Sequence, residues 1–139
     1  PNHGPLADPT RFTTLFSDAA AESMRYYKST GIFPAHHATI LRRSIAEAHP
    51  WAAKSLLDAF TEAQRLTMER TYGQAPSALI FADDALIRQR AVFGDDPYAY
   101  GVRANAEVID TVQSFAVETG AVASKLAESD LYAAGVLDS

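Results

Sequence analysis

The residues best suited to chemistry form two adjacent pairs within the stretch 31–51, His36-His37 and Arg42-Arg43. A neutral imidazole can hydrogen-bond to a carboxylate or a phenol, and it can pass on a proton near neutral pH. A guanidinium offers two parallel donors that match the two oxygens of a carboxylate. These residue types therefore suit an anionic ligand, although their spacing alone specifies no reaction.

The two histidines have a structural interpretation as well. Successive strand residues point to opposite faces, so His36 and His37 line one pocket only if a bulge lies between them. One of the two is then structural. They also lack the i, i+4 helical spacing of paired metal ligands, and no nearby carboxylates complete a set, so no metal site is predicted.

The arginines and a later acidic loop are ambiguous in the same way. One arginine of the pair can face water while the other pairs with Glu47, and the sequence favours this structural role. In the loop GDDPYAYGVRAN, the pair Asp95-Asp96 with Tyr98 and Tyr100 could form an acid–base site with aromatic walls. Aspartate between glycine and proline is ordinary turn chemistry, and loop tyrosines often pack against a helix. The pattern favours the structural interpretation here too.

The elements that must position these residues follow from local signals. Residues 35–41 alternate between two faces, which predicts a short strand. Ser44 and Glu47 have the spacing of a capping box and predict one helical turn. Pro50 suits the first position of a long helix that is expected to end near Tyr72, where Gly73 and Pro76 follow.

The remaining segments are predicted to be helices and loops. Residues 1–17 indicate an extended linker, and Asp18 is expected to cap a helix through Ser29. The other expected elements are a helix ending at Phe93, the loop 94–105, a helix capped by Asn105, a short helix near 127–132 and a frayed tail over 135–139.

Composition limits the possible classes of protein. A chain of 139 residues that is 47% hydrophobic suits one domain with a core. Its net charge of -5 argues against a nucleic-acid partner or an anionic membrane surface. The absence of cysteine excludes disulfides and thiolate chemistry, and no apolar run is long enough for a membrane span.

One strand alone leaves backbone groups unpaired on both of its edges. The strand at 35–41 could pair with a missing part of a larger polypeptide or with a second copy of the chain, or the segment is not a strand. The first explanation is favoured.

The segments GIFPAHHATILRR, HPWAAKSLLDAFTEA and GDDPYAYGVRAN together resemble the C-terminal portion of the 4,5-dihydroxyphthalate decarboxylase family. That family resembles the type II periplasmic binding protein superfamily, whose members have two α/β lobes. The resemblance implies that residues 18–139 are the C-terminal, mainly helical part of one lobe, and that the strand near 35–41 crosses between lobes.

The resemblance also implies a function. It indicates a decarboxylase-like protein that acts on a small aromatic dicarboxylate, with His37 as the catalytic residue and His36, Arg43 and Tyr98 as substrate-binding residues. It identifies no cofactor. The alternative is the substrate-binding protein of an ABC-type transporter with the same fold and no catalysis. An enzyme would be cytoplasmic and a solute-binding protein periplasmic. A third hypothesis is a helical module that self-associates through its unpaired strand.

Overall fold

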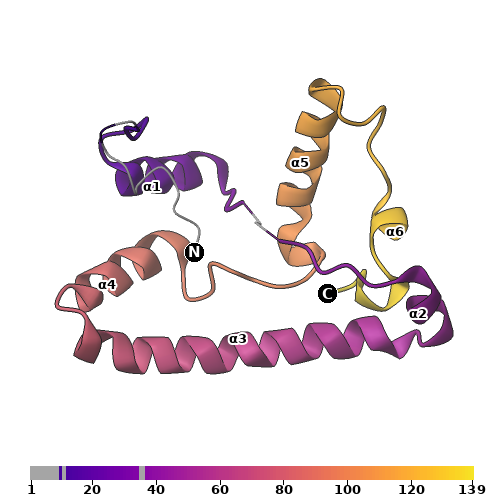
Figure 1. Cartoon of the computed structure of the whole chain (residues 1–139), viewed down its shortest axis with the longest axis horizontal. Coiled ribbons are helices and arrows are strands. Elements are labelled where there is room, and N and C mark those ends of the chain that lie inside the picture. Colours follow the sequence, from indigo (N-terminus) through magenta and orange to yellow (C-terminus); the bar gives the residue numbers. More distant parts are fainter. Residues whose placement is uncertain (1–9, 11, 35–36) are drawn as a thin grey trace. The chain divides into compact units, whose positions relative to one another are not determined.

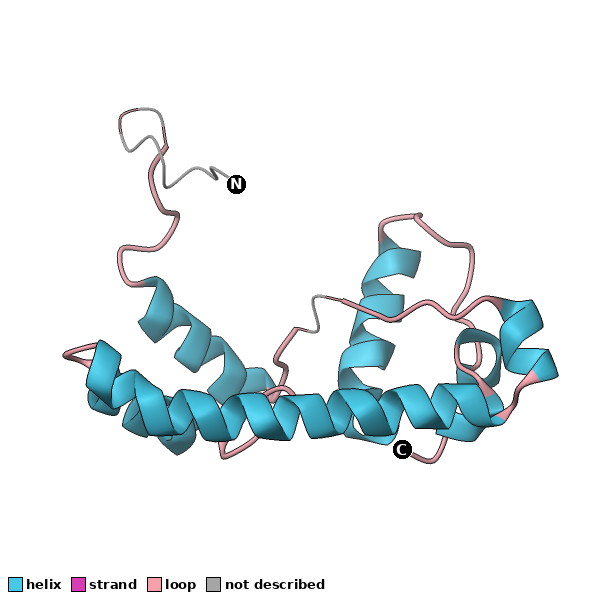
Figure 2. Cartoon of the chain, turned by 60° about the horizontal axis from the view of Figure 1, so that its bottom comes forward, coloured by secondary structure: helices cyan, strands magenta, loops and turns pink. Residues whose placement is uncertain are grey.

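The computed structural model describes residues 10, 12–34 and 37–139, and within them the chain consists of helices joined by loops (Figures 1 and 2). It divides into two compact units, Pro1–Ile32 and Phe33–Ser139. The elements are α1 (Ala19–Thr30), α2 (Arg43–Ala48), α3 (Trp51–Ala78), α4 (Ala82–Phe93), the 3-10 turn η2 (Arg103–Asn105), α5 (Ala106–Glu118), α6 (Glu128–Leu131) and the 3-10 turn η3 (Ala134–Val136). The mainly helical prediction is confirmed.

The first unit contains α1, which has the predicted N-cap Asp18 and ends at Thr30, one residue after the predicted Ser29. The Asp18 side chain accepts a hydrogen bond from the backbone N–H of Ala21 at 2.9 Å. At the other end Gly31 is left-handed, with φ 71°, and its N–H donates to the carbonyl of Tyr27. Both signals act within one helical turn, so the sequence alone was sufficient to place them.

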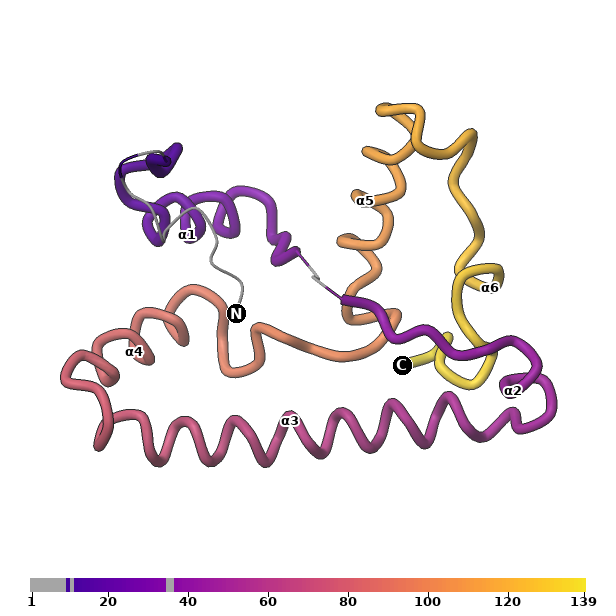
Figure 3. Tube along the Cα trace, in the orientation of Figure 1, coloured from indigo at the N-terminus to yellow at the C-terminus, as the bar shows by residue number. Residues whose placement is uncertain are grey.

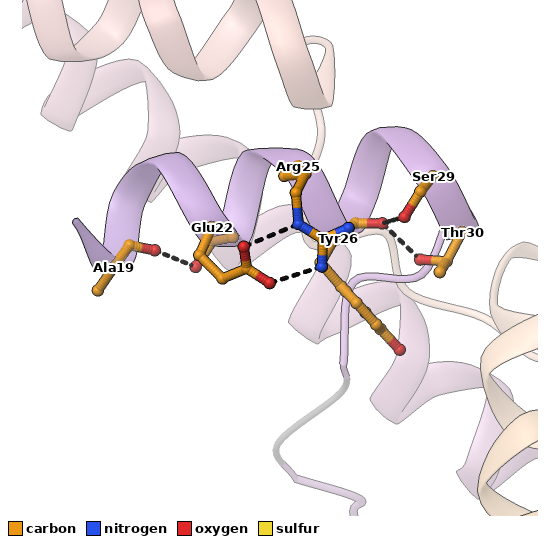
Figure 4. A network of polar contacts seen from close by, with 7 residues as sticks. Ala19, Glu22, Arg25, Tyr26, Ser29 and Thr30 are labelled. Atoms are coloured by element: carbon orange, nitrogen blue, oxygen red, sulfur yellow. Dashed lines mark hydrogen bonds and ion pairs between the residues drawn. The ribbon is translucent and has the colours of Figure 1, made fainter. Parts of the chain in front are cut away.

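Short-range polar contacts stabilise the exposed surface of α1 (Figure 4). Arg25 donates two hydrogen bonds to the carboxylate of Glu22, at 2.8 and 2.6 Å. The hydroxyls of Ser29 and Thr30 both donate to the carbonyl of Tyr26 near the end of the helix. These contacts satisfy polar groups within one helical turn of each other.

The strand predicted at 35–41 is not formed in the described part of that segment. Residues 37–41 have no regular secondary structure, and residues 35 and 36 lie outside the described residues. Alternating side chains are not sufficient for a strand, because its backbone groups need a partner strand. Within the described ranges the chain offers no such partner.

The second unit is built around α3, which is longer than predicted. It continues past Gly73 and includes Pro76, ending at Ala78. A proline so close to the end of a helix disturbs only the last turn. The capping box was also wrong, because α2 begins at Arg43, two residues before the position that a Ser44 N-cap implies, and no side chain caps it.

The helix α4 follows α3 after a short turn, and side chains join the two helices. The guanidinium of Arg90 lies 4.4 Å from the ring centroid of Tyr72. The side chain of Gln89 donates to the hydroxyl of the same tyrosine at 3.4 Å. As predicted, α4 ends at Phe93, where Gly94 has a positive φ of 76°.

The described residues bury few side chains. Only Ala82 and Val102 qualify as buried apolar residues among them. Even the aromatic side chains of Trp51 and Phe60 on α3 are 67% and 39% exposed. Among the described residues, no helix is long and apolar enough to cross a membrane.

Candidate functional site

An open groove of about 940 Å³ lies within the second unit. Its walls come from residues 33–34, residues 37–39 and 41, α2, the first half of α3, residues 97–102, the start of α5 and the segment 129–139. The stripe on α3 that faces it is Ala53, Leu56, Leu57 and Phe60. These positions follow the i, i+3, i+4, i+7 spacing of one helical face.

Aromatic rings form much of one wall. Phe33 makes edge-to-face contacts with Phe93 and Tyr98, with ring centroids 5.4 and 5.3 Å apart. Phe60 stacks on Tyr100 at 6.2 Å with an angle of 17° between the ring planes. Tyr98 and Tyr100 remain 55% and 48% exposed. The rings are therefore positioned by packing and still accessible to a ligand.

The 94–105 loop, which carries both tyrosines, is held from α3 by Gln64. The Gln64 amide donates to a carboxylate oxygen of Asp96 and to the carbonyl of Tyr98, both at 2.9 Å. The same oxygen of Asp96 accepts from the backbone N–H of Tyr98 at 3.2 Å. Asp95 lies 3.4 Å from Arg90 in an exposed ion pair. Both aspartates thus have turn and surface contacts, as the structural interpretation predicted.

The loop is held a second time by Asn105. Its side-chain amide donates to the carbonyls of Ala99 and Gly101, at 2.8 Å each. Asn105 occupies the predicted N-cap position of α5, but its side chain makes no cap hydrogen bond. The predicted capping role of the Asn105 side chain is therefore wrong, because its amide donates to the preceding loop and forms no hydrogen bond with the first turn of α5.

A third contact comes from the end of the chain (Figure 3). The carbonyl of Ser139 accepts from the N–H of Arg103 at 2.6 Å, and its hydroxyl accepts from the N–H of Val102 at 3.1 Å. Arg103 also pairs with Asp138, and that hydrogen bond raises the pKa of the guanidinium. The predicted frayed tail over 135–139 is wrong, because these residues are bound to the loop.

The groove brings together three of the four predicted site residues. His37, Arg43 and Tyr98 all line it. His36 lies outside the described residues. Sequence reasoning missed the contributions of Phe60, whose helical spacing was a usable signal, and of the 129–139 segment, for which no local signal exists. The roles of the three residues stay predictions.

Arg43 is the charged group of most interest. The expected ion pair with Glu47 is not formed, although both residues line the groove. In the part of the chain that the structure describes, Arg43 forms no ion pair, and its side chain is exposed. The neighbouring Arg42 is not among the groove residues. Arg43 therefore offers an available cation at the edge of an apolar and aromatic surface.

The described residues include no cluster of three or more His, Cys, Asp or Glu side chains that could hold a metal ion. The polar groups of the groove are instead well suited to hydrogen bonding. The imidazole, the guanidinium and the tyrosine hydroxyls can bind carboxylate and phenol oxygens.

Comparison with known proteins gives one relative of interest. No family model matches the chain. The chain is 28% identical over 127 residues to the 4,5-dihydroxyphthalate decarboxylase of Comamonas testosteroni. The match covers 90% of this chain and 38% of that protein, so the chain spans well under half of the relative's length. It is thus distantly related in sequence to a decarboxylase.

Proposed function

We propose that this chain is part of a decarboxylase-like protein that binds a small aromatic dicarboxylate in the groove. The observation that carries this proposal is the placement of Arg43, without an ion pair to any described residue, in one groove with His37 and the ring of Tyr98. The sequence relationship to 4,5-dihydroxyphthalate decarboxylase supports the same class of ligand.

The groove suits such a ligand in shape and in chemistry. Its volume of about 940 Å³ is within the range of small-molecule sites. An aromatic ring can pack against Tyr98 and Tyr100, which prefer offset or edge contacts. A carboxylate of the ligand can accept two parallel hydrogen bonds from Arg43. The apolar stripe of α3 provides the floor.

The proposed reaction breaks one bond and forms another without an oxidant. The bond between a ring carbon and its carboxylate breaks, and carbon dioxide leaves. The electron pair stays on the ring, where a ring oxygen delocalises the charge. A proton then forms the new C–H bond. We assign to His37 either the delivery of this proton or the orientation of the group that delivers it.

The rest of a longer polypeptide, or a second copy of the chain, would complete the site. The chain spans 38% of its relative. Ile80 and Phe81 are 93% and 76% exposed, and such apolar side chains gain stability when covered. In this proposal the whole protein has a two-lobed α/β fold, and the 35–41 segment becomes a strand only when a partner strand pairs with it.

The test is release of carbon dioxide from 4,5-dihydroxyphthalate by the complete native polypeptide. His37→Ala is expected to abolish release while the circular dichroism spectrum is unchanged. His49→Ala is the matched control, because His49 is an exposed histidine that is not among the groove residues. Undiminished turnover in His37→Ala would remove His37 from the mechanism. A wild-type protein that binds the compound and releases no carbon dioxide would instead support the solute-binding alternative.

A further inference from the structure

We propose that residues 134–139 form a clamp that positions the tyrosine wall of the groove and so determines whether an aromatic ligand is preferred. The part of this inference that concerns ligands rests on the proposed function. The part that concerns the loop rests on the contacts alone.

The clamp fixes the loop directly after the two tyrosines. Ser139 accepts two backbone hydrogen bonds, from the N–H groups of Val102 and Arg103. Val102 is 4% exposed and is one of two buried apolar residues among those described. A buried N–H group that loses its acceptor is unfavourable, so the hydroxyl of Ser139 has a specific function at this point.

Gly101 shows how closely the clamp approaches the loop. Its φ is 117°, a conformation that L side chains rarely adopt. A Cβ atom at this position would lie 2.8 Å from the backbone carbon of Ser139 and 3.0 Å from its carbonyl oxygen. Because the clashing atoms are backbone atoms, a side chain here must displace the clamp.

The other end of the clamp is held at the start of α3. A Cβ atom on Gly135 would lie 3.2 Å from the carbonyl oxygen of Pro50, so the two backbones are close together. Inside the clamp, the hydroxyl of Ser139 donates to the carbonyl of Val136 at 2.5 Å. The clamp therefore connects the start of α3 to the loop, and both of these form walls of the groove.

The expected consequence concerns Tyr98 and Tyr100 but not Arg43, which lies on α2. Displacement of the clamp should move the aromatic wall and leave the guanidinium in place. Affinity for an aromatic dicarboxylate should then fall more than affinity for a saturated dicarboxylate of similar size. A general loss of stability would instead lower the affinity for both ligands equally.

The first test compares Gly101→Ala with Gly120→Ala in the complete native polypeptide. Both glycines have positive φ, but a Cβ atom at Gly120 meets nothing within 4 Å. Amide hydrogen exchange at Val102 and Arg103 is expected to accelerate at least about tenfold in Gly101→Ala and to stay near the wild-type rate in Gly120→Ala. Equal exchange rates in the two variants would overturn the clamp.

The second test removes the Ser139 hydroxyl, which accepts from the N–H of Val102 and donates to the carbonyl of Val136. Ser139→Ala is expected to weaken binding of phthalate several-fold more than binding of cis-cyclohexane-1,2-dicarboxylate, and Ser139→Thr, which keeps the hydroxyl, should restore the wild-type ratio. An unchanged ratio in Ser139→Ala would overturn the positioning role. If the wild-type protein binds neither compound, the proposed ligand class is wrong, and the exchange experiment alone decides on the clamp.

Discussion

Replacement of Asn105 distinguishes a loop-holding side chain from a helix cap. Its amide donates to the carbonyls of Ala99 and Gly101 at 2.8 Å each, and both acceptors belong to the loop that carries the tyrosines. A cap would instead accept a hydrogen bond from the first turn of α5. The two roles differ in whether position 105 must donate or accept.

The expected magnitude follows from the two hydrogen bonds. Each neutral hydrogen bond contributes about 1 kcal/mol net, so Asn105→Ala should lower the free energy of unfolding by about 2 kcal/mol. For a chain of this size that corresponds to a melting temperature lower by roughly 6 °C.

Asn105→Asp is the decisive variant. A carboxylate cannot donate, and it would face two carbonyl oxygens, so this variant should lose about 2 kcal/mol or more. The favourable interaction of a negative charge with the helix dipole at the start of α5 would offset only about 0.3–1 kcal/mol of that loss. Urea unfolding monitored by circular dichroism measures both variants against the wild-type protein.

The opposite ranking would refute the loop-holding role. If Asn105 were a cap, aspartate would replace it with little change, and alanine would cost about 1 kcal/mol. A wild-type midpoint for Asn105→Asp together with a lower midpoint for Asn105→Ala would therefore show that the side chain caps α5.

Two further predictions concern α3. Phe60 stacks on Tyr100, so a double-mutant cycle of Phe60→Ala and Tyr100→Ala should give a coupling of about 1 kcal/mol, and additive effects would contradict the contact. A hydrogen bond from Arg65 lowers the pKa of Glu62, so its stabilisation is present at neutral pH and is lost as pH falls from about 5 to 3. Helix content of Glu62→Gln should consequently fall less over that range, by a small amount because the pair is exposed; an unchanged pH profile would show that the pair contributes nothing.

The sequence predicted those parts of the fold that depend on neighbouring residues. Asp18 and Gly31 lie at the ends of α1 because each acts within one helical turn. Gly73 and Pro76 were misleading, because weak helix formers near the end of a long helix do not have to stop it. The strand failed for another reason, since pairing depends on a second segment that local patterns do not reveal.

The sequence was sufficient to select candidate site residues, but it did not predict the groove in which they lie. The capacity of an imidazole and a guanidinium to bind a carboxylate is a property of the side chains of His37 and Arg43. The structure places both residues in one groove with Tyr98. The contact between Ser139 and Val102 joins residues far apart in the chain, and no periodicity encodes it. The missing ion pair of Arg43 likewise depends on three-dimensional positions.

The measurement that tests the central claim most directly is titration of phthalate into the complete native polypeptide carrying Arg43→Ala or Arg42→Ala. A hydrogen bond to a charged group is worth about 1.5–3 kcal/mol, so Arg43→Ala should weaken binding by about 10-fold to 100-fold. Arg42→Ala removes the same charge from a residue that is not among the groove residues and should change binding little. Equal losses in the two variants, or full affinity in Arg43→Ala, would contradict carboxylate binding in this groove.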